Sequence, residues 1–233
     1  MTLHAWLRFD AIDRMLPPGD GRVLEIGVGK GAVGSVLASR YRYVGLEPDP
    51  ESFAAASAVI DGDVLPLSEE DFSDGHFDLV CAFEVLEHLE DDETALRRWQ
   101  RHLRPCGTLM ISVPAGSHRF GATDEKAGHY RRYDREDLAA KLKRSGLGDV
   151  EVVAYGFPLG YALEAGRNLI ARRMTTPTSM DERTAGSGRW LQAPEWASIP
   201  LWLCAVPFRL MQRPFGQRLG TGLVACGRLS AST

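Results

Sequence analysis

The chain has 233 residues, of which 44% are hydrophobic and 25% are charged, and its formal net charge at pH 7 is −4. These values are typical of a soluble globular protein with a full core. Because nucleic-acid binders usually carry an excess of basic residues, the acidic balance argues against a nucleic-acid partner.

The first 156 residues alternate short apolar runs, typical of strands, with amphipathic runs, typical of helices. The predicted strands are residues 23–27, 43–47, 77–83, 107–113 and 150–155, with a further short strand before Gly62. The predicted helices are 32–40, 52–58, 93–103 and one that starts after Asp134 and ends at Gly146. This alternation predicts a Rossmann-like α/β fold with a doubly wound parallel sheet, which binds ligands beyond the carboxyl ends of its strands.

The pattern changes after Gly156. Residues 164–173 look helical, 175–188 form a polar run without periodicity, and 190–215 are rich in Trp, Pro and Leu. Residues 222–227 then have the pattern of a final strand. We therefore predict a seven-stranded sheet with a helical lid inserted before the last strand. The predicted boundaries are 1–156 for the core, 157–218 for the lid, and 219–233 for the final strand and tail.

Neither the cysteines nor the apolar runs indicate a metal centre or a membrane span. The four cysteines form no CxxC pair and have no zinc-like spacing to a partner. Free thiols and the lack of a secretory pattern predict a cytoplasmic protein. The apolar stretch 199–211 is interrupted by Pro200, Pro207 and Arg209, so it is too short and too broken to cross a bilayer.

The strongest motif is EIGVGKG, residues 25–31, directly after a predicted strand and before a predicted helix. Glycines let the backbone approach a ligand, and the helix N-terminus adds N–H donors. A phosphate-binding P-loop is excluded, because Lys30 is followed by glycine and Leu24 stands where the first glycine is required. A dinucleotide loop stays open, with Ala32 as its third small residue. Glu25 favours a cationic amino-acid ligand, since its carboxylate would repel a pyrophosphate.

Two acidic residues follow at predicted strand ends. Glu47 ends the second strand, where a carboxylate can accept two hydrogen bonds from ribose hydroxyls. Asp63 follows Gly62 after the third short strand, where it can accept a hydrogen bond from an adenine amino group. Each alone is also explained as a solvated loop charge. Together they predict one pocket for ribose and adenine.

These motifs resemble those of class I S-adenosylmethionine (SAM)-dependent methyltransferases, most closely the bacterial group that includes ubiquinone and small-molecule methyltransferases. The runs that carry the resemblance are VLEIGVGKG, VGLEPD, GDVLPL, FDLVCAFEVLEHLED and LRPCGTLMISVPA, over residues 20–155. The resemblance implies that SAM is the cofactor of the core. The cofactor contacts it implies are Glu25, Gly27, Gly29 and Gly31 at the methionine half, Glu47 and Pro48 at the ribose, Asp63 and Val64 at the adenine, and Glu84 beside the cofactor. Cys106 departs from the glycine usual in this family, in a turn away from the cofactor.

Methyl transfer is an in-line displacement, so much of its rate comes from alignment of the nucleophile, and a general base is needed only for a protonated acceptor. His88 lies one helical turn beyond Glu84, and His129 and Tyr130 lie in the long connection after the fifth strand. We predict these three residues, His88, His129 and Tyr130, as catalytic candidates. His88 is equally explained as a surface histidine that packs on the sheet edge.

The run GHYRRY, residues 128–133, offers two guanidiniums beside two aromatic rings, and bacterial relatives often carry a similar GHxRRY segment. Two roles stay open for Arg131 and Arg132. One arginine can pin the loop by pairing with a nearby carboxylate, and the other can bind the carboxylate or phosphate of an anionic substrate. The carboxylates available for pinning are Asp124, Glu125 and Asp134.

Aromatic side chains at the two ends of the chain extend the predicted substrate site. Trp6 can wall off the active site or simply pack on the sheet edge. The aromatic residues from 155 to 202 suggest an apolar or ring-bearing substrate, but a dimer surface or a lipid-contacting patch fits them equally well. The predicted substrate contacts are Trp6, Arg131, Arg132, Tyr133 and Tyr161.

The sequence therefore predicts a SAM-dependent methyltransferase that acts on an O, N or C atom of a small molecule, anionic or aromatic, in small-molecule biosynthesis. A homodimer is compatible with the sequence. The alternative is an enzyme of the same fold that catalyses a cyclisation or elimination, because it would keep the glycine loop. An NAD-dependent dehydrogenase is disfavoured by Glu25 and Asp63, and a nonenzymatic subunit has no need for this set of residues.

Overall fold

The structure is a computed structural model, and it describes residues 2–173, 206–215 and 219–231. The chain divides into two compact units. Unit 1 consists of Met1–Met15, Val113–Asp137 and Val152–Val224, and unit 2 consists of Leu16–Ser112, Leu138–Glu151 and Ala225–Thr233. Three strands, β5, β6 and β7, have residues in both units.

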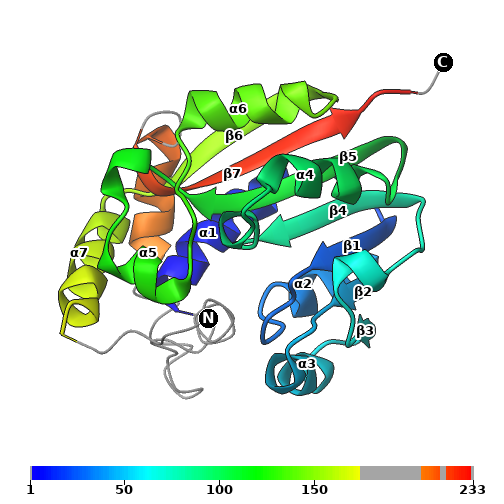
Figure 1. Cartoon of the computed structure of the whole chain (residues 1–233), viewed down its shortest axis with the longest axis horizontal. Helices are drawn as coiled ribbons and strands as arrows, with labels where there is room; N and C mark the ends of the chain where they lie inside the picture. Colours follow the sequence, from blue (N-terminus) through cyan, green and yellow to red (C-terminus); the bar gives the residue numbers. More distant parts are fainter. Residues whose placement is uncertain (1, 174–205, 216–218, 232–233) are drawn as a thin grey trace. The chain divides into compact units, whose positions relative to one another are not determined.

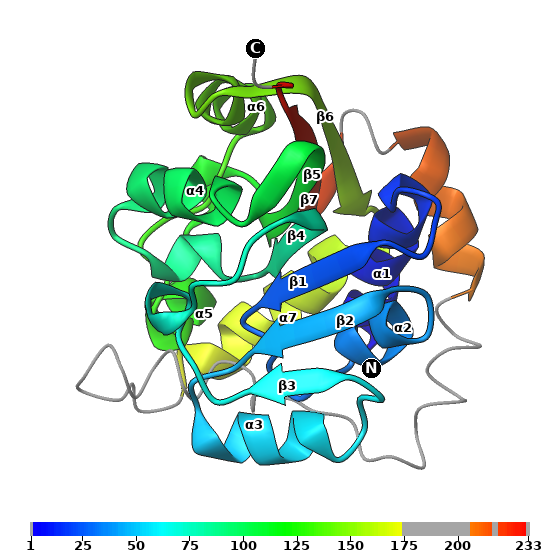
Figure 2. The same cartoon turned by 90° about the vertical axis from the view of Figure 1, so that its right-hand side faces the viewer.

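The predicted seven-stranded sheet is confirmed, with the strand order β3-β2-β1-β4-β5-β7-β6. The strands are β1 (Arg22–Ile26), β2 (Arg42–Leu46), β3 (Asp63–Leu65), β4 (Phe77–Phe83), β5 (Leu103–Pro114), β6 (Leu147–Gly156) and β7 (Gly220–Leu229). The first five strands in chain order pair in parallel. Figure 2 shows β1, β2 and β3 side by side, with α3 (Pro50–Ser57) next to β3. Such a sheet aligns the carboxyl ends of its parallel strands along one edge, where ligands bind.

The last strand corrects the expectation of an entirely parallel sheet. Gly156, the final residue of β6, lies against Thr221 at the beginning of β7. Figure 1 shows β7 running opposite to β5. A strand that starts at the edge where its neighbour ends is antiparallel to that neighbour and needs no crossover to the opposite edge.

The helices are α1 (Leu3–Met15), α2 (Gly34–Ala38), α3, α4 (Asp92–Gln100), α5 (Ala122–Ala127), α6 (Arg135–Arg144) and α7 (Leu159–Ala171), with 3-10 turns η1 (Glu69–Asp71), η2 (Leu86–His88), η3 (Ser117–Arg119) and η5 (Arg213–Phe215). Five helices, α2, α3, α4, α6 and α7, lie close to predicted segments but differ at their ends, whereas α1 and α5 were not predicted. Local chemistry sets the start of α3, because the Asp49 carboxylate accepts the Ser52 N–H at 2.9 Å and Pro50 occupies the first turn. Leu103, predicted as the end of a helix, instead begins β5.

The core of unit 2 is built on β4, whose apolar residues are almost completely buried. The predicted stripe on α4 is confirmed, because Ala95, Leu96 and Trp99 are all buried. A strand that is apolar on both faces and a helix with one apolar face form the layered packing expected of an α/β sheet.

In unit 1, a buried polar cluster attaches helix α1 to the helical residues 206–212. The Asp10 carboxylate is 1% exposed and accepts hydrogen bonds from Gln212 Nε2 at 3.1 Å and Arg213 Nη2 at 2.8 Å. Gln212 Nε2 also donates to the Leu7 carbonyl at 3.0 Å, and its Oε1 accepts the Gly156 N–H at 2.9 Å. One glutamine therefore connects α1, β6 and the helical segment before β7.

The described parts of the predicted lid, residues 157–173 and 206–215, belong to unit 1. Its helix α7 begins at Leu159 rather than at Glu164. The predicted polar loop 175–188 and most of the tryptophan-rich segment lie outside the described residues, so the lid and its boundaries stay a prediction. Among the residues that the structure describes, no helix has the length and apolar character needed to cross a membrane.

Candidate functional site

The glycine loop follows β1 at the edge of the sheet, as predicted. Gly27, Gly29 and Gly31 have φ values of 73°, 57° and 81°, a left-handed conformation that side chains other than glycine rarely adopt. The N–H groups of Gly27 and Val28 donate to the Leu46 carbonyl at 2.9 and 3.2 Å. The loop is therefore fixed to the carboxyl end of β2, beside the position of Glu47.

Glu47 joins the end of β2 to the glycine loop. Its Oε2 accepts the Gly29 N–H at 2.7 Å, and its Oε1 accepts the Asp49 N–H at 3.0 Å. Burial raises the pKa of this carboxyl above its usual value, and the two backbone donors only partly oppose that effect. Because a carboxylate has about four acceptor positions, these two bonds leave capacity for ribose hydroxyls.

Glu25 is 2% exposed, and its predicted contact with the cofactor stays a prediction. Its Oε2 accepts the Tyr43 hydroxyl at 2.6 Å.

The position of Asp63 differs from the prediction. It is the first residue of β3 and pairs with Val44, whereas Leu65, at the other end of β3, pairs with Leu46. Asp63 is thus exposed at the amino end of a parallel strand, away from the edge that carries Glu47. The sequence pattern was misleading because the strand begins at Asp63 instead of ending before it. Val64 is half-buried in β3 and Pro48 is exposed after β2, so their cofactor contacts stay predictions.

Glu84 follows β4 directly and has a φ of 59°, unusual for a residue with a side chain. Its N–H donates to the Ser112 carbonyl at 2.9 Å, and its Oε1 accepts the Ser112 hydroxyl at 2.9 Å. Two hydrogen bonds to one residue of β5 hold this conformation at the carboxyl end of β4. His88, the last residue of η2, is half-buried, and its catalytic role stays a prediction.

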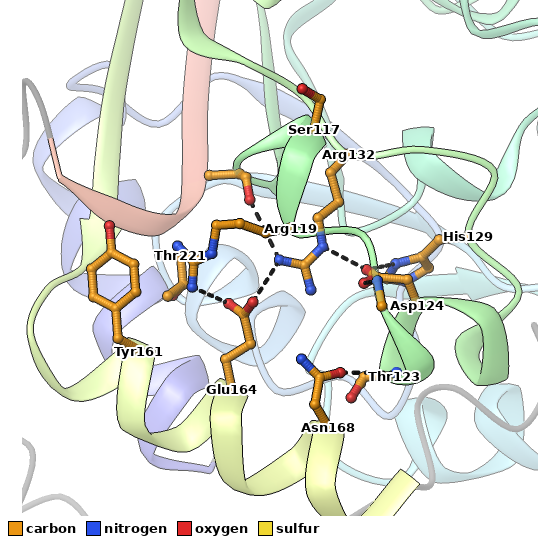
Figure 3. A network of polar contacts seen from close by, with 12 residues as sticks. Ser117, Arg119, Thr123, Asp124, His129, Arg132, Tyr161, Glu164, Asn168 and Thr221 are labelled. Carbon is orange, nitrogen blue, oxygen red and sulfur yellow. Dashed lines mark hydrogen bonds and ion pairs between the residues drawn. The ribbon is translucent and has the colours of Figure 1, made fainter. Parts of the chain in front are cut away.

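Unit 1 contains a buried chain of charged side chains (Figure 3). Arg132 Nε donates to Asp124 Oδ1 at 2.8 Å, and Arg132 Nη1 donates to Glu164 Oε1 at 2.9 Å. Arg119 Nη2 donates to the other Glu164 oxygen at 2.8 Å. The predicted pairing of an arginine in the GHYRRY run with Asp124 is confirmed for Arg132. This side chain is buried between two carboxylates, so it positions the loop rather than meeting a substrate.

His129 belongs to the same chain of contacts. Its Nδ1 lies 2.8 Å from Asp124 Oδ1, so when the ring is neutral Nδ1 carries the proton and Nε2 carries the lone pair. Burial by itself would raise the pKa of Asp124, but hydrogen bonds from His129 and Arg132, together with the Arg132 charge, hold it below its usual value. An ionised carboxylate fixed in this way orients an imidazole as a base.

The other members of the GHYRRY run have different environments. Tyr130 is 42% exposed, Arg131 is half-buried and Tyr133 is buried. Tyr133 makes an isolated bridge with Ala115, in which its N–H donates to the Pro114 carbonyl at 3.0 Å. The run therefore returns along the end of β5 before α6 begins.

Two predicted substrate residues, Tyr133 and Tyr161, line one cavity of about 440 Å³ in unit 1. Arg119 stacks over the Tyr161 ring with its guanidinium carbon 4.2 Å from the ring centroid. The Tyr161 hydroxyl donates to the Gly220 carbonyl at 3.3 Å. The wall also holds His118 and charged groups of both signs, Asp134, Arg135 and Glu136.

Trp6 lies on α1, half-buried, with its ring edge-on to Phe9 and the Arg209 guanidinium 5.9 Å from its centroid. These contacts match the packing interpretation of Trp6, and its role toward a substrate stays a prediction.

Sequence reasoning missed Glu164, Arg119 and Tyr43. Glu164 was seen only as the start of a helix, and Arg119 and Tyr43 carried no motif. The one available signal was that two adjacent arginines need carboxylate partners. This signal identified Asp124 but not Glu164, which lies 32 residues after Arg132 in the chain.

A glycine loop after β1, a carboxylate after β2 and this strand order together define a Rossmann-like enzyme of the class I methyltransferase type. The family model described as "Methyltransferase domain" matches residues 5–152. The chain belongs to this methyltransferase family. It is a SAM-dependent methyltransferase, and SAM is its cofactor.

Individual methyltransferases are also similar to this chain. A ubiquinone biosynthesis O-methyltransferase of Xanthomonas axonopodis pv. citri is 30% identical over 169 residues, which are 62% of this chain and 71% of that protein. A trans-aconitate 2-methyltransferase of Deinococcus radiodurans is 33% identical over 113 residues, 42% of each chain. The structure of a SAM-dependent methyltransferase from Thermotoga maritima aligns with a TM-score of 0.60 at 19% identity, covering 97% of this chain and 89% of that one.

Proposed function

We propose that this methyltransferase moves the methyl group of SAM to an oxygen atom of a small-molecule acceptor and that His129 removes the acceptor proton. The observation that carries the proposal is the 2.8 Å contact between His129 Nδ1 and the buried Asp124 carboxylate. A histidine oriented by a carboxylate is the usual arrangement for a general base near neutral pH. The two curated relatives, a ubiquinone biosynthesis O-methyltransferase and a trans-aconitate 2-methyltransferase, support a small acceptor.

We assign the cofactor to the glycine loop and the end of β2. Gly27 and Gly29 are half-buried and leave backbone accessible to the methionine half, whereas Gly31 is buried. Glu47 accepts from the ribose hydroxyls while it holds Gly29. Glu84 stands at the carboxyl end of β4, on the same edge of the sheet. The residues present fit a nucleoside with an amino-acid tail, because they combine open backbone with carboxylate acceptors and offer no cradle for phosphate.

SAM, when bound, supplies an electrophilic methyl group on a sulfonium. Transfer of that methyl group to an acceptor hydroxyl would release the hydroxyl proton, and His129 Nε2 would accept it. Asp124 stabilises the imidazolium that results, since its carboxylate is already bound to Nδ1. Arg132 and Glu164 keep Asp124 in place. Alignment of the two reactants provides most of the remaining acceleration.

We propose that the cavity lined by Tyr133 and Tyr161 holds a part of the acceptor away from its reacting hydroxyl, because His129 is not among the lining residues. The cavity has a volume of about 440 Å³, which suits a small molecule, and its aromatic and charged walls suit an anionic or ring-bearing one. Arg131 and Tyr130 remain candidates for further acceptor contacts. A lid over residues 157–218 and a homodimer also remain proposals.

The test begins with a screen of hydroxylated and carboxylated small molecules against SAM carrying an isotope-labelled methyl group. For the acceptor found, His129→Ala should lower kcat on the order of 10²- to 10⁴-fold, the usual contribution of a general base, with the Kd of SAM unchanged. Asp124→Asn should lower kcat less and shift the pH–rate profile, because it alters His129 without removing it. Tyr161→Ala should raise KM for the acceptor.

An unchanged kcat in His129→Ala would remove the base from the proposal. Product that forms without label would instead favour a cyclisation or elimination on the same fold.

A further inference from the structure

A tyrosine hydroxyl and a carboxylate meet in the interior of unit 2, between β1 and β2. Tyr43 Oη donates to Glu25 Oε2 at 2.6 Å, and both side chains are at least nine-tenths buried. This distance is within the range of a hydroxyl bound to an ionised carboxylate, which is shorter and stronger than a bond between neutral groups.

Two glycines leave the space in which these groups meet. A Cβ at Gly45, on β2 with Tyr43, would lie 2.6 Å from the Tyr43 hydroxyl oxygen. A Cβ at Gly34, in the first turn of α2, would lie 2.5 Å from the same oxygen and 2.8 Å from Glu25 Oε2. Both distances are shorter than real Cβ contacts, so each glycine is needed for this geometry.

Glu47, at the end of β2, has a negative charge that acts on Tyr43. Cys81 on β4 pairs with Glu25 in the sheet and also acts on Tyr43. Burial raises the pKa of Tyr43 and Cys81, with the negative charge of Glu25 as a further cause, so both remain neutral. The Tyr43 hydroxyl is therefore a donor that can stabilise the Glu25 charge.

We propose that Tyr43 is a positioning residue of the cofactor site, which keeps the Glu25 carboxylate ionised and fixed beside the glycine loop. The inference rests on the proposed function, in which this loop holds SAM. The fixed negative charge favours SAM, which carries a sulfonium, over the neutral thioether S-adenosylhomocysteine (SAH), because only the sulfonium differs in charge between the two ligands. The enzyme thereby gains selectivity for its cofactor over its product.

The experiment measures the Kd of SAM and of SAH by calorimetry for the full chain and for Tyr43→Phe, which keeps the ring and removes only the donor. We expect SAM affinity to fall roughly three- to tenfold and SAH affinity to change less than about twofold, as a partly screened charge at several ångströms implies. The matched control is Tyr41→Phe, which removes a hydroxyl that donates to the Pro17 carbonyl at 2.5 Å, in the same unit. Tyr41→Phe should leave the SAM-to-SAH ratio unchanged.

A pH profile separates this role from a purely structural one. Tyr43→Phe removes a hydrogen bond that favours the ionised form of Glu25, so SAM affinity in the variant should begin to fall at a higher pH than in the unmodified chain. In a Glu25→Gln background, Tyr43→Phe should have no further effect on the SAM-to-SAH ratio.

The outcomes are distinguishable. If the unmodified chain binds neither ligand, the proposed function is wrong. If it binds both and Tyr43→Phe lowers both affinities equally or neither, with the same pH profile, only the role of Tyr43 is overturned.

Discussion

Two buried carboxylates, one in each unit, are stabilised in different ways. In unit 2, Glu47 is bound by two backbone N–H groups, and burial raises its pKa. In unit 1, Asp124 is bound by Arg132 and His129 and its pKa is lowered. Burial disfavours the ionised form of the first carboxylate, whereas hydrogen bonds from Arg132 and His129 and the Arg132 charge favour the ionised form of the second.

This difference indicates different roles. A carboxylate held only by neutral donors retains its charge for a ligand, so Glu47 is suited to binding. The charge of Asp124 is balanced within the protein by Arg132, so Asp124 is suited to fixing the loop and orienting His129. Substitutions in and around the two sites test this difference between a ligand-binding carboxylate, Glu47, and a positioning carboxylate, Asp124.

The greatest loss of stability is expected from Arg132→Met. The substitution leaves Asp124 and Glu164 buried without their shared cation, so the free energy of unfolding should fall by about 3–5 kcal/mol. Urea unfolding measures this change. The control is Arg144→Met, at a side chain 63% exposed, which should change it by less than about 0.5 kcal/mol. If Arg132→Met lowered the free energy of unfolding no more than Arg144→Met does, the buried chain of charges would add no stability.

The greatest loss of binding is expected from Gly29→Val. A β-branched residue is strained at a φ of 57°, and its side chain occupies the backbone surface that we assign to SAM. The Kd of SAM, measured by calorimetry, should rise on the order of 100-fold, or about 2.7 kcal/mol. Circular dichroism must show that the variant is folded. A folded variant with unchanged affinity would place the cofactor elsewhere.

The two carboxylates should differ in the pH dependence of stability. Because the pKa of Asp124 is lowered on folding from its ordinary 3.8, Asp124 stabilises the fold above that pH and the stabilisation is lost as pH falls through the lowered pKa. At pH 7, Asp124→Asn should therefore cost about 2 kcal/mol, a difference that shrinks in acid. Thermal and urea unfolding between pH 7 and 3 measure it.

For Glu47 the sign is reversed. Its pKa is raised from 4.5, so ionisation opposes folding, and Glu47→Gln should leave the fold as stable as before or slightly more stable at pH 7. SAM affinity should nevertheless fall, on the order of tenfold, because the ribose loses a charged acceptor. In the unmodified chain, SAM affinity should decline with acid at a pH above the usual range of a glutamate. A Glu47→Gln variant that lost stability and kept its affinity for SAM would show that Glu47 stabilises the fold and does not bind SAM, the opposite of its proposed role.

The smallest effect is expected from Asp63→Ala. Since Asp63 begins β3 at the amino end of the sheet, its removal should change the Kd of SAM by less than about twofold. Calorimetry with Glu47→Ala as the positive control gives the comparison. A tenfold loss in Asp63→Ala would restore the adenine contact that the sequence pattern predicted.

The sequence by itself determined the features that local chemistry dictates. Alternating apolar and amphipathic runs predicted the strands and helices of the core, because periodicity reports which faces are buried. The glycine loop and Glu47 were predictable because they adjoin strands, and the parallel strands of such a sheet end along one edge. Strand β4 was predicted with its observed bounds, since all of its residues except Asp78 are apolar.

Only the tertiary structure decided which distant residues meet. Arg132, in the connection between α5 and α6, pairs with Glu164 on α7. Tyr43 on β2 reaches Glu25 on β1 through the space left by Gly34 and Gly45. No spacing in the sequence encodes these contacts, because a charged or hydroxyl side chain has many partners available until the fold selects one. The antiparallel course of β7 was undecided for the same reason: a short apolar run predicts a strand but not its direction.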